Sequence, residues 1–157
     1  MLDTSLLHHL KTLRDQGKKI TLVTGVFDLL HQEHKIFLEK ASQIGDVLIV
    51  GVESDARVRQ LKGENRPIQN QELRKKQIEA LNLADTVFIL PEEFTTAEHY
   101  DQFVKEILPA YLAVSSHTPF QESKEMLMKK YGGELKVVHE FNPEVSTTIL
   151  EKKLARS

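Results

Sequence analysis

The sequence predicts an α/β protein with a Rossmann-like, doubly wound sheet of about five parallel strands and helices on both faces. Apolar, β-branched runs recur along the chain, and helical patterns separate them. These runs cover residues 20–24, 46–52, 86–90, 111–115 and 134–139. The first two are apolar over nearly their whole length, which is typical of parallel strands covered on both faces. The length of 157 residues fits one domain, residues 1–157, with a buried core.

The first helix is expected at the start of the chain, where leucines recur at helical spacing. Thr4 or Ser5 is expected to cap it and Gly17 to stop it. After the first strand, an apolar stripe predicts a second helix that ends at Gly45. That stripe consists of Phe37, Leu38, Ala41 and Ile44.

Further helices are expected between the later strands. Their patterns cover residues 71–83, 97–107 and 121–131. The polar stretch 61–71 contains Gly63 and Pro67 and is expected to be a loop. Ligands of doubly wound sheets bind outside the carboxyl ends of the strands, so the loops that follow strands are the places to search for a site.

The loop after the first strand joins that strand to a helix start. The strand 20–24 breaks at Gly25, and helical periodicity begins just past His31. Backbone N–H groups at a helix start lack intrahelical partners and favour an anion, most often a phosphate. His31 and His34 are three residues apart, so both imidazoles are expected on one face of the first turn, aimed at that phosphate.

These residues carry a family resemblance. The string Gly25-Val-Phe-Asp-Leu-Leu-His31, followed by His34, resembles the Gly-x-Phe-Asp-x-x-His-x-Gly-His signature of the cytidylyltransferase-like nucleotidyltransferases. Members of that family join a nucleoside triphosphate to a phosphorylated small molecule and release pyrophosphate. The resemblance implies that Asp28 orients the second substrate or helps to hold Mg²⁺. It also implies nucleotide contacts from Gly25, Val26, Phe27, His31 and His34.

One position departs from that signature, because Glu33 stands where the family has glycine. A carboxylate aimed at a phosphate about 4 Å away would cost about 4 kcal/mol at an effective dielectric of 20. A carboxylate in the first turn of a helix is, however, favourable when it turns outward. Both orientations of Glu33 are consistent with the sequence.

The loop that begins at Lys62 carries several cations. Read without analogy, they either close over an anionic ligand or stay solvated. The Lys62-Gly-x-x-Arg66-Pro spacing is similar to a loop in the adenylyltransferase domain that makes ADP-heptose, whereas glycerol-3-phosphate cytidylyltransferases share mainly the later Arg74. The resemblance implies catalytic roles for Lys62 and Arg66 and a substrate contact for Arg74.

A third motif lies near the end of the chain. The string Ser146-Thr147-Thr148 is similar to the second phosphate-contacting motif of the family. Thr148 and Glu151 also have the spacing of a capping box, so a structural cap explains the same residues. Both interpretations can hold together.

The loop after the fourth strand departs from the family pattern. The string Val114-Ser115-Ser116-His117 stands where the heptose-phosphate enzymes carry Lys-Gly-Gly-Asp. The nucleotide pocket is therefore expected to differ at this point. Ser115 is the candidate for a nucleotide contact here, although this loop can equally bind another ligand or none.

Composition excludes several classes of function. The formal charge of −2 gives no general attraction to nucleic acid or to an anionic membrane, and the chain has no cysteine for disulfides or thiolate metal sites. The first residues lack a signal peptide, and no apolar run approaches the length of a membrane span. A cytoplasmic protein is expected. A homodimer is expected only from the resemblance.

The histidine pair has a second interpretation as a zinc site. The string His31-Gln-Glu-His34 matches neither His-Glu-x-x-His nor His-x-x-Glu-His, and no third ligand is evident by spacing, so no protein-bound metal is predicted. The remaining histidines are expected on the surface or in the core. Apart from His117, which belongs to the loop after the fourth strand, they are His8, His9, His99 and His139.

Two functional hypotheses from different classes follow, and a third stands below them. The first is an active nucleotidyltransferase that uses ATP in preference to CTP, with Mg²⁺, and a sugar phosphate or polyol phosphate as acceptor. The second is a catalytically impaired relative that binds a nucleotide or a protein partner, favoured by Glu33 and by the altered loop at 114–117. FMN adenylylation is a third, because some archaeal relatives have a similar small domain.

Overall fold

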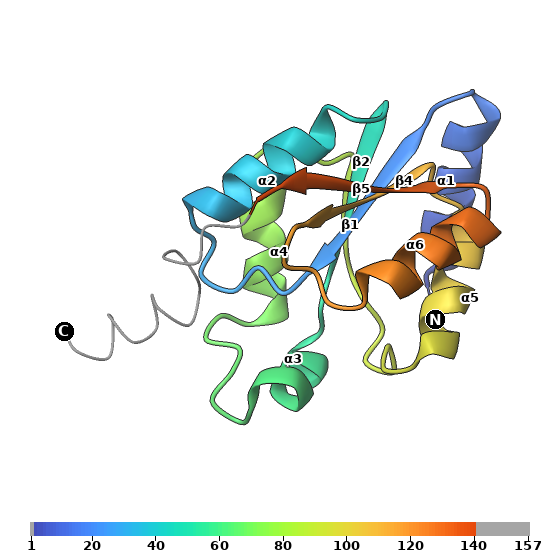
Figure 1. Ribbon diagram of the computed structural model, residues 1–157. Helices are drawn as coiled ribbons and strands as arrows, with labels where there is room; N and C mark the ends of the chain where they lie inside the picture. The colour runs from blue at the N-terminus through green and yellow to red at the C-terminus, as the bar shows by residue number, and fades with distance from the viewer. Residues whose placement is uncertain (1, 141–157) are drawn as a thin grey trace.

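The computed structural model describes residues 2–140, and a single five-stranded parallel sheet lies at its centre (Figure 1). The strand order is β3-β2-β1-β4-β5. The strands are β1 (Ile20–Gly25), β2 (Val47–Val52), β3 (Thr86–Ile89), β4 (Tyr111–Ser115) and β5 (Glu134–His139). The chain builds the sheet outward from β1 in both directions, so the winding reverses between β1 and β4. The predicted doubly wound parallel sheet is confirmed.

Helices cover both faces of this sheet. They are α1 (Thr4–Asp15), α2 (Gln32–Ser42), α3 (Asp55–Lys62), α4 (Gln71–Glu79), α5 (Ala97–Ile107) and α6 (Gln121–Lys130). Successive strand residues point to opposite faces. Leu22 accordingly packs in one buried cluster with Ile107 of α5, and Val23 packs in another with Leu38 of α2. Figure 1 shows α2 and α4 on one side of the sheet and α1, α5 and α6 on the other.

The ends of the first two helices follow from local chemistry. The cap of α1 is Asp3, whose carboxylate accepts a hydrogen bond from the Ser5 N–H at 3.0 Å, so the expectation of Thr4 or Ser5 was wrong. A carboxylate one residue earlier caps the helix and also complements its dipole. Gly45 follows α2 because a Cβ there would lie 2.7 Å from the Lys19 carbonyl oxygen.

Two helical boundaries differ from the sequence pattern. Helix α3 was not predicted, because Val58 is its one buried residue and no apolar stripe marks it. The Ser54 side chain caps α3 by accepting from the Arg57 N–H at 3.1 Å. Helix α4 ends at Glu79 and not at residue 83, and Asn82 adopts a left-handed backbone with φ of 56°.

The third motif, Ser146-Thr147-Thr148, lies outside the described residues. Within residues 2–140, no helix combines the length and the apolar character that crossing a membrane requires.

Candidate functional site

A pocket of about 390 Å³ lies at the carboxyl ends of β1 and β4, where the winding of the sheet reverses. The loop after β1 and the start of α2 form one part of its wall, and the loop after β4 and the start of α6 form another. Most of the predicted site residues meet here. Those in the wall are Gly25, Val26, Phe27, His31, His34, Lys62 and Ser115. Asp28, Arg66 and Arg74 lie outside this wall.

A second hollow, of about 590 Å³, lies along the edge strand β3. Leu2, Phe88 and Glu92 are among its lining residues, and the predicted site residues are not. Although this hollow is larger, the smaller pocket is the better candidate because the polar groups of the histidine motif converge on it.

The histidine pair forms as the helical spacing predicts. His31 is the N-cap of α2 and His34 is the third residue of its first turn. The two rings stack with their centroids 3.7 Å apart and their planes 17° from parallel. The backbone N–H of His31 donates to Nδ1 of His34 at 3.3 Å. Nδ1 is thus an acceptor, so a neutral His34 carries its proton on Nε2 and can donate a hydrogen bond from that atom.

Burial keeps both imidazoles neutral. It lowers the pKa of His34 to about 3, helped by the nearby His31 and Lys62 and opposed by Asp28. Burial also lowers the pKa of His31, and the Glu33 carboxylate opposes that shift. At neutral pH the pair therefore offers N–H donors and not positive charges.

Phe27 and Gly25 shape the floor beside the pair. The edge of the Phe27 ring faces His34, with centroids 5.5 Å apart and an interplanar angle of 76°. A Cβ at Gly25 would lie 2.8 Å from a ring carbon of Phe27. Because the ring fills that space, glycine at position 25 is a packing requirement of the loop.

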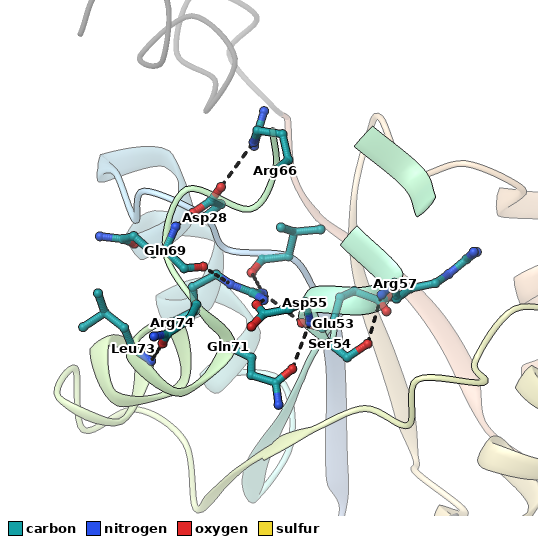
Figure 2. A network of polar contacts seen from close by, with 12 residues as sticks. Asp28, Glu53, Ser54, Asp55, Arg57, Arg66, Gln69, Gln71, Leu73 and Arg74 are labelled. Atoms are coloured by element: carbon teal, nitrogen blue, oxygen red, sulfur yellow. Dashed lines mark hydrogen bonds and ion pairs between the residues drawn. The ribbon is translucent and has the colours of Figure 1, made fainter. Parts of the chain in front are cut away.

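Asp28 ties the loop after β1 to the loop that precedes α4. One carboxylate oxygen accepts from the Ile68 N–H at 2.7 Å and from Nε of Arg66 at 3.2 Å, and the other accepts from the Gln69 N–H at 2.9 Å (Figure 2). Asp28 as a whole is 1% exposed. In this arrangement Asp28 positions the loop, and the expectation that it touches a substrate or a metal ion does not match its burial.

Arg74 is fully buried and organises the same region from beneath. Its guanidinium donates to the backbone carbonyls of Gln69, Val26 and Glu53 at 2.8–2.9 Å and to the Asp55 carboxylate at 2.8 Å (Figure 2). The residue has 0% exposure, so it cannot reach a ligand here. The predicted substrate contact is corrected to a positioning role, in which Arg74 joins the ends of β1 and β2 to the start of α4.

The two predicted cations of the loop have different surroundings. Lys62 ends α3, is exposed and lines the pocket. Arg66 is 6% exposed and bonds to Asp28. Of the two, Lys62 is placed to meet an anion in the pocket, and Arg66 is placed to hold the loop.

Glu33 lies in the pocket wall but is turned toward β5, where its carboxylate pairs with Nε2 of His139. Nδ1 of His139 lies 3.1 Å from Nζ of Lys40. His139 was expected to be an ordinary surface or core residue. It lies instead in the pocket wall, because β5 ends beside the start of α2.

Three further polar residues of the pocket wall come from the β4–α6 side. His117, Thr118 and Lys124 all line it, and Nζ of Lys124 donates to Oγ1 of Thr118 at 2.9 Å. The altered string after the fourth strand drew attention to His117. Lys124 gave no signal of its own, since it is one lysine among several in a polar helix.

Mg²⁺, which is expected to enter with a nucleoside triphosphate, would find few protein ligands among the described residues. Among the described residues, no group of three or more His, Cys, Asp or Glu side chains is placed to hold a metal ion. Both oxygens of Asp28 already accept hydrogen bonds from the loop. Mg²⁺ commonly keeps water and phosphate ligands and takes few from protein, which fits this set of side chains.

Comparison with known proteins agrees with the motif. Residues 22–153 match the cytidylyltransferase-like family model. The chain is 37% identical over 142 residues to the bifunctional protein HldE of Pelobacter propionicus, a match that covers 90% of this chain and 28% of that protein. It is 34% identical over 160 residues to the HldE protein of Cronobacter sakazakii, covering 100% of this chain and 32% of that one. The chain thus spans only 28% to 32% of the length of these curated relatives.

Solved structures share the fold. A lipopolysaccharide core biosynthesis protein from Thermoplasma volcanium superposes with a TM-score of 0.65 and 27% identity, covering 80% of this chain and 98% of the other. Pantoate-beta-alanine ligase from Francisella tularensis has a TM-score of 0.55 and 16% identity over 92% of this chain and 73% of its own, and so shares the fold alone. Since the family model spans most of the sequence and curated relatives match nearly all of it, the chain belongs to the cytidylyltransferase-like family.

Proposed function

We propose that this chain is a nucleotidyltransferase that joins a nucleoside triphosphate to a sugar phosphate or polyol phosphate and releases pyrophosphate. One observation carries the proposal: the stacked His31 and His34 rings begin α2 inside a pocket at the carboxyl end of β1. ATP is favoured over CTP because the Lys62-Gly-x-x-Arg66-Pro string is similar to the loop of an adenylyltransferase domain.

The reaction needs two anions to meet in line. An oxygen of the acceptor phosphate attacks the α-phosphorus of the nucleotide, and the bond from that phosphorus to the bridging oxygen breaks as pyrophosphate leaves. No covalent enzyme intermediate is required, so positioning and electrostatics carry the catalysis. Mg²⁺ bound to the triphosphate would supply further charge neutralisation.

The histidines have the form that this chemistry needs. Neutral imidazoles can donate N–H hydrogen bonds to phosphate oxygens as negative charge grows on them, without a rearrangement at the moment of reaction. Lys62, at the pocket, would add a full positive charge toward the leaving pyrophosphate. Asp28 and Arg74 keep the loops that carry these groups in place.

The proposal is tested by pyrophosphate release with Mg²⁺, measured with ATP and CTP separately. The acceptor panel contains heptose 1-phosphate, glycerol 3-phosphate, other sugar phosphates and FMN. We expect release with one nucleotide and one acceptor, and a loss of about 10²- to 10³-fold in His31→Ala. The matched control is His8→Ala, an exposed histidine of α1 that should keep full activity.

Glu33 favours a second candidate, a relative that binds nucleotide without turnover, because this acidic residue lines the pocket where the family motif has glycine. Calorimetry separates the two when release is not observed. Tight ATP or CTP binding without turnover on any acceptor supports the second candidate, and the lack of any nucleotide binding contradicts both.

A further inference from the structure

Lys62 and Lys124 are the lysines among the described residues of the pocket wall. Lys62 ends α3, the helix after β2, and Lys124 lies in the first turns of α6, the helix after β4. Since β1 lies between β2 and β4 in the sheet, these two positive charges flank the end of β1 and its histidine pair. The reaction proposed above brings two polyanions into this pocket. Lys62 can neutralise negative charge on one side of the histidine pair only.

The contacts of Lys124 fix the position of its ammonium group. Its Nζ donates to Oγ1 of Thr118 at 2.9 Å and lies 6.0 Å from the centroid of the Tyr100 ring. In the part of the chain that the structure describes, no carboxylate forms an ion pair with it. An ammonium group has three donors, and Thr118 takes one, so two can serve a ligand. The Thr118 hydroxyl accepts from Lys124 and can therefore turn its own hydrogen toward the same ligand.

Partial burial increases the attraction between this ammonium group and an anion. Lys124 is half-buried, and burial lowers its pKa while Glu53 opposes the shift. A cation that has lost part of its water shell interacts more strongly with an anion than a solvated one does. These features distinguish Lys124 from the exposed lysines of the same helix, Lys129 and Lys130.

We propose that Lys124 and Thr118 bind a phosphate oxyanion of one of the two substrates, on the side of the pocket opposite to Lys62. The identity of the substrates rests on the proposed function, but the presence of an anion site does not. The bound phosphate belongs either to the nucleotide or to the acceptor, and the two sources are separated by experiment.

A structural role for Lys124 is the competing explanation. Burial raises the pKa of the half-buried Glu53, and Arg57, Arg74 and Lys124 oppose that shift. If the only role of Lys124 is to stabilise the charged carboxylate of Glu53, the lysine is no longer required once that carboxylate is removed. The variant Glu53→Gln therefore separates the two roles.

The first measurement is calorimetric binding of inorganic pyrophosphate to the whole chain. We expect Lys124→Ala to weaken binding about 10- to 100-fold, the range for a lost hydrogen bond to a charged group. Lys124→Arg should recover most of that loss, and Lys129→Ala on the exposed face of α6 should change nothing. Unchanged binding in Lys124→Ala, or a wild-type chain that binds neither pyrophosphate nor ATP, overturns the proposal. So does restored binding in Lys124→Ala/Glu53→Gln.

Steady-state kinetics then assign the phosphate to its source. A higher KM for the nucleotide alone places the nucleotide at Lys124, and a higher KM for the acceptor alone places the acceptor there. If His31→Ala abolishes release while Lys124→Ala leaves both KM values unchanged, this proposal fails and the proposed function stands. If pyrophosphate binding depends on Lys124 but no acceptor supports release, the anion site stands and the proposed function fails.

Discussion

The Glu33 carboxylate pairs with Nε2 of His139, so the residue that replaces the motif glycine is tied to the end of β5. Lys40 completes a chain of contacts, because its Nζ lies 3.1 Å from Nδ1 of His139. An ammonium group only donates, so Nδ1 accepts and the imidazole proton sits on Nε2, facing Glu33. The pair lies in the pocket wall, where it draws the carboxylate toward β5.

We expect His139→Ala to raise the KM for the nucleotide about 3- to 10-fold. Without its partner, the Glu33 carboxylate can turn to the phosphates, and like charges about 4 Å apart repel by about 1 kcal/mol when water screens them, which corresponds to about fivefold. The double variant His139→Ala/Glu33→Gln should return the KM to near the wild-type value. Equal losses in the single and the double variant would contradict this account.

We expect Glu33→Gly to lower the stability of the protein and to leave kcat/KM within about tenfold. The substitution removes a favourable carboxylate from the first turn of α2 and adds the backbone entropy of glycine, together about 1–2 kcal/mol. Urea unfolding measures the first effect and pyrophosphate release the second. A gain well above tenfold would instead identify the natural chain as an impaired relative.

We expect Arg74→Ala to destabilise the fold by about 3–5 kcal/mol, since it leaves Asp55 and several backbone carbonyls without their buried donor. Arg74→Lys should recover little, because an ammonium group cannot span these acceptors as the planar guanidinium does. Chemical denaturation measures the free energy of unfolding of each variant. The exposed Lys76→Ala on the same helix is the control and should stay within about 0.5 kcal/mol of wild type.

The sequence predicted what depends on neighbours along the chain. The strand and helix periods of the sequence predicted the sheet. The three-residue spacing of His31 and His34 predicted that their side chains lie together. The sequence did not predict the burial of Arg74. The acceptors of this side chain, Val26, Glu53 and Asp55, lie in segments that come close together only when the sheet folds. The positions of Lys124 and His139 in the pocket wall likewise depend on how the β4 side packs beside β1.

The neutral His34 should make stability fall as the pH is lowered. The pKa of His34 is about 3 in the folded protein, against an ordinary value of 6.5. Between these values the unfolded chain binds a proton that the folded chain does not, so the free energy of unfolding rises with pH in this window. The contribution is complete above pH 6.5 and declines toward pH 3 by at most about 1.4 kcal/mol per pH unit.

Urea unfolding of wild type and His34→Gln at pH 7.5, 6.0 and 5.0 measures this term. Glutamine does not titrate, so His34→Gln should lose less stability than wild type over the same interval, whatever its stability at pH 7.5. The acidic and basic groups away from His34 contribute equally in both proteins and cancel in the difference, whereas His31, stacked on His34, adds a smaller change of its own. Parallel pH profiles would show that the folded-state pKa of His34 is near its ordinary value. The pair would then reach the phosphates as partly charged imidazolium and not as neutral donors.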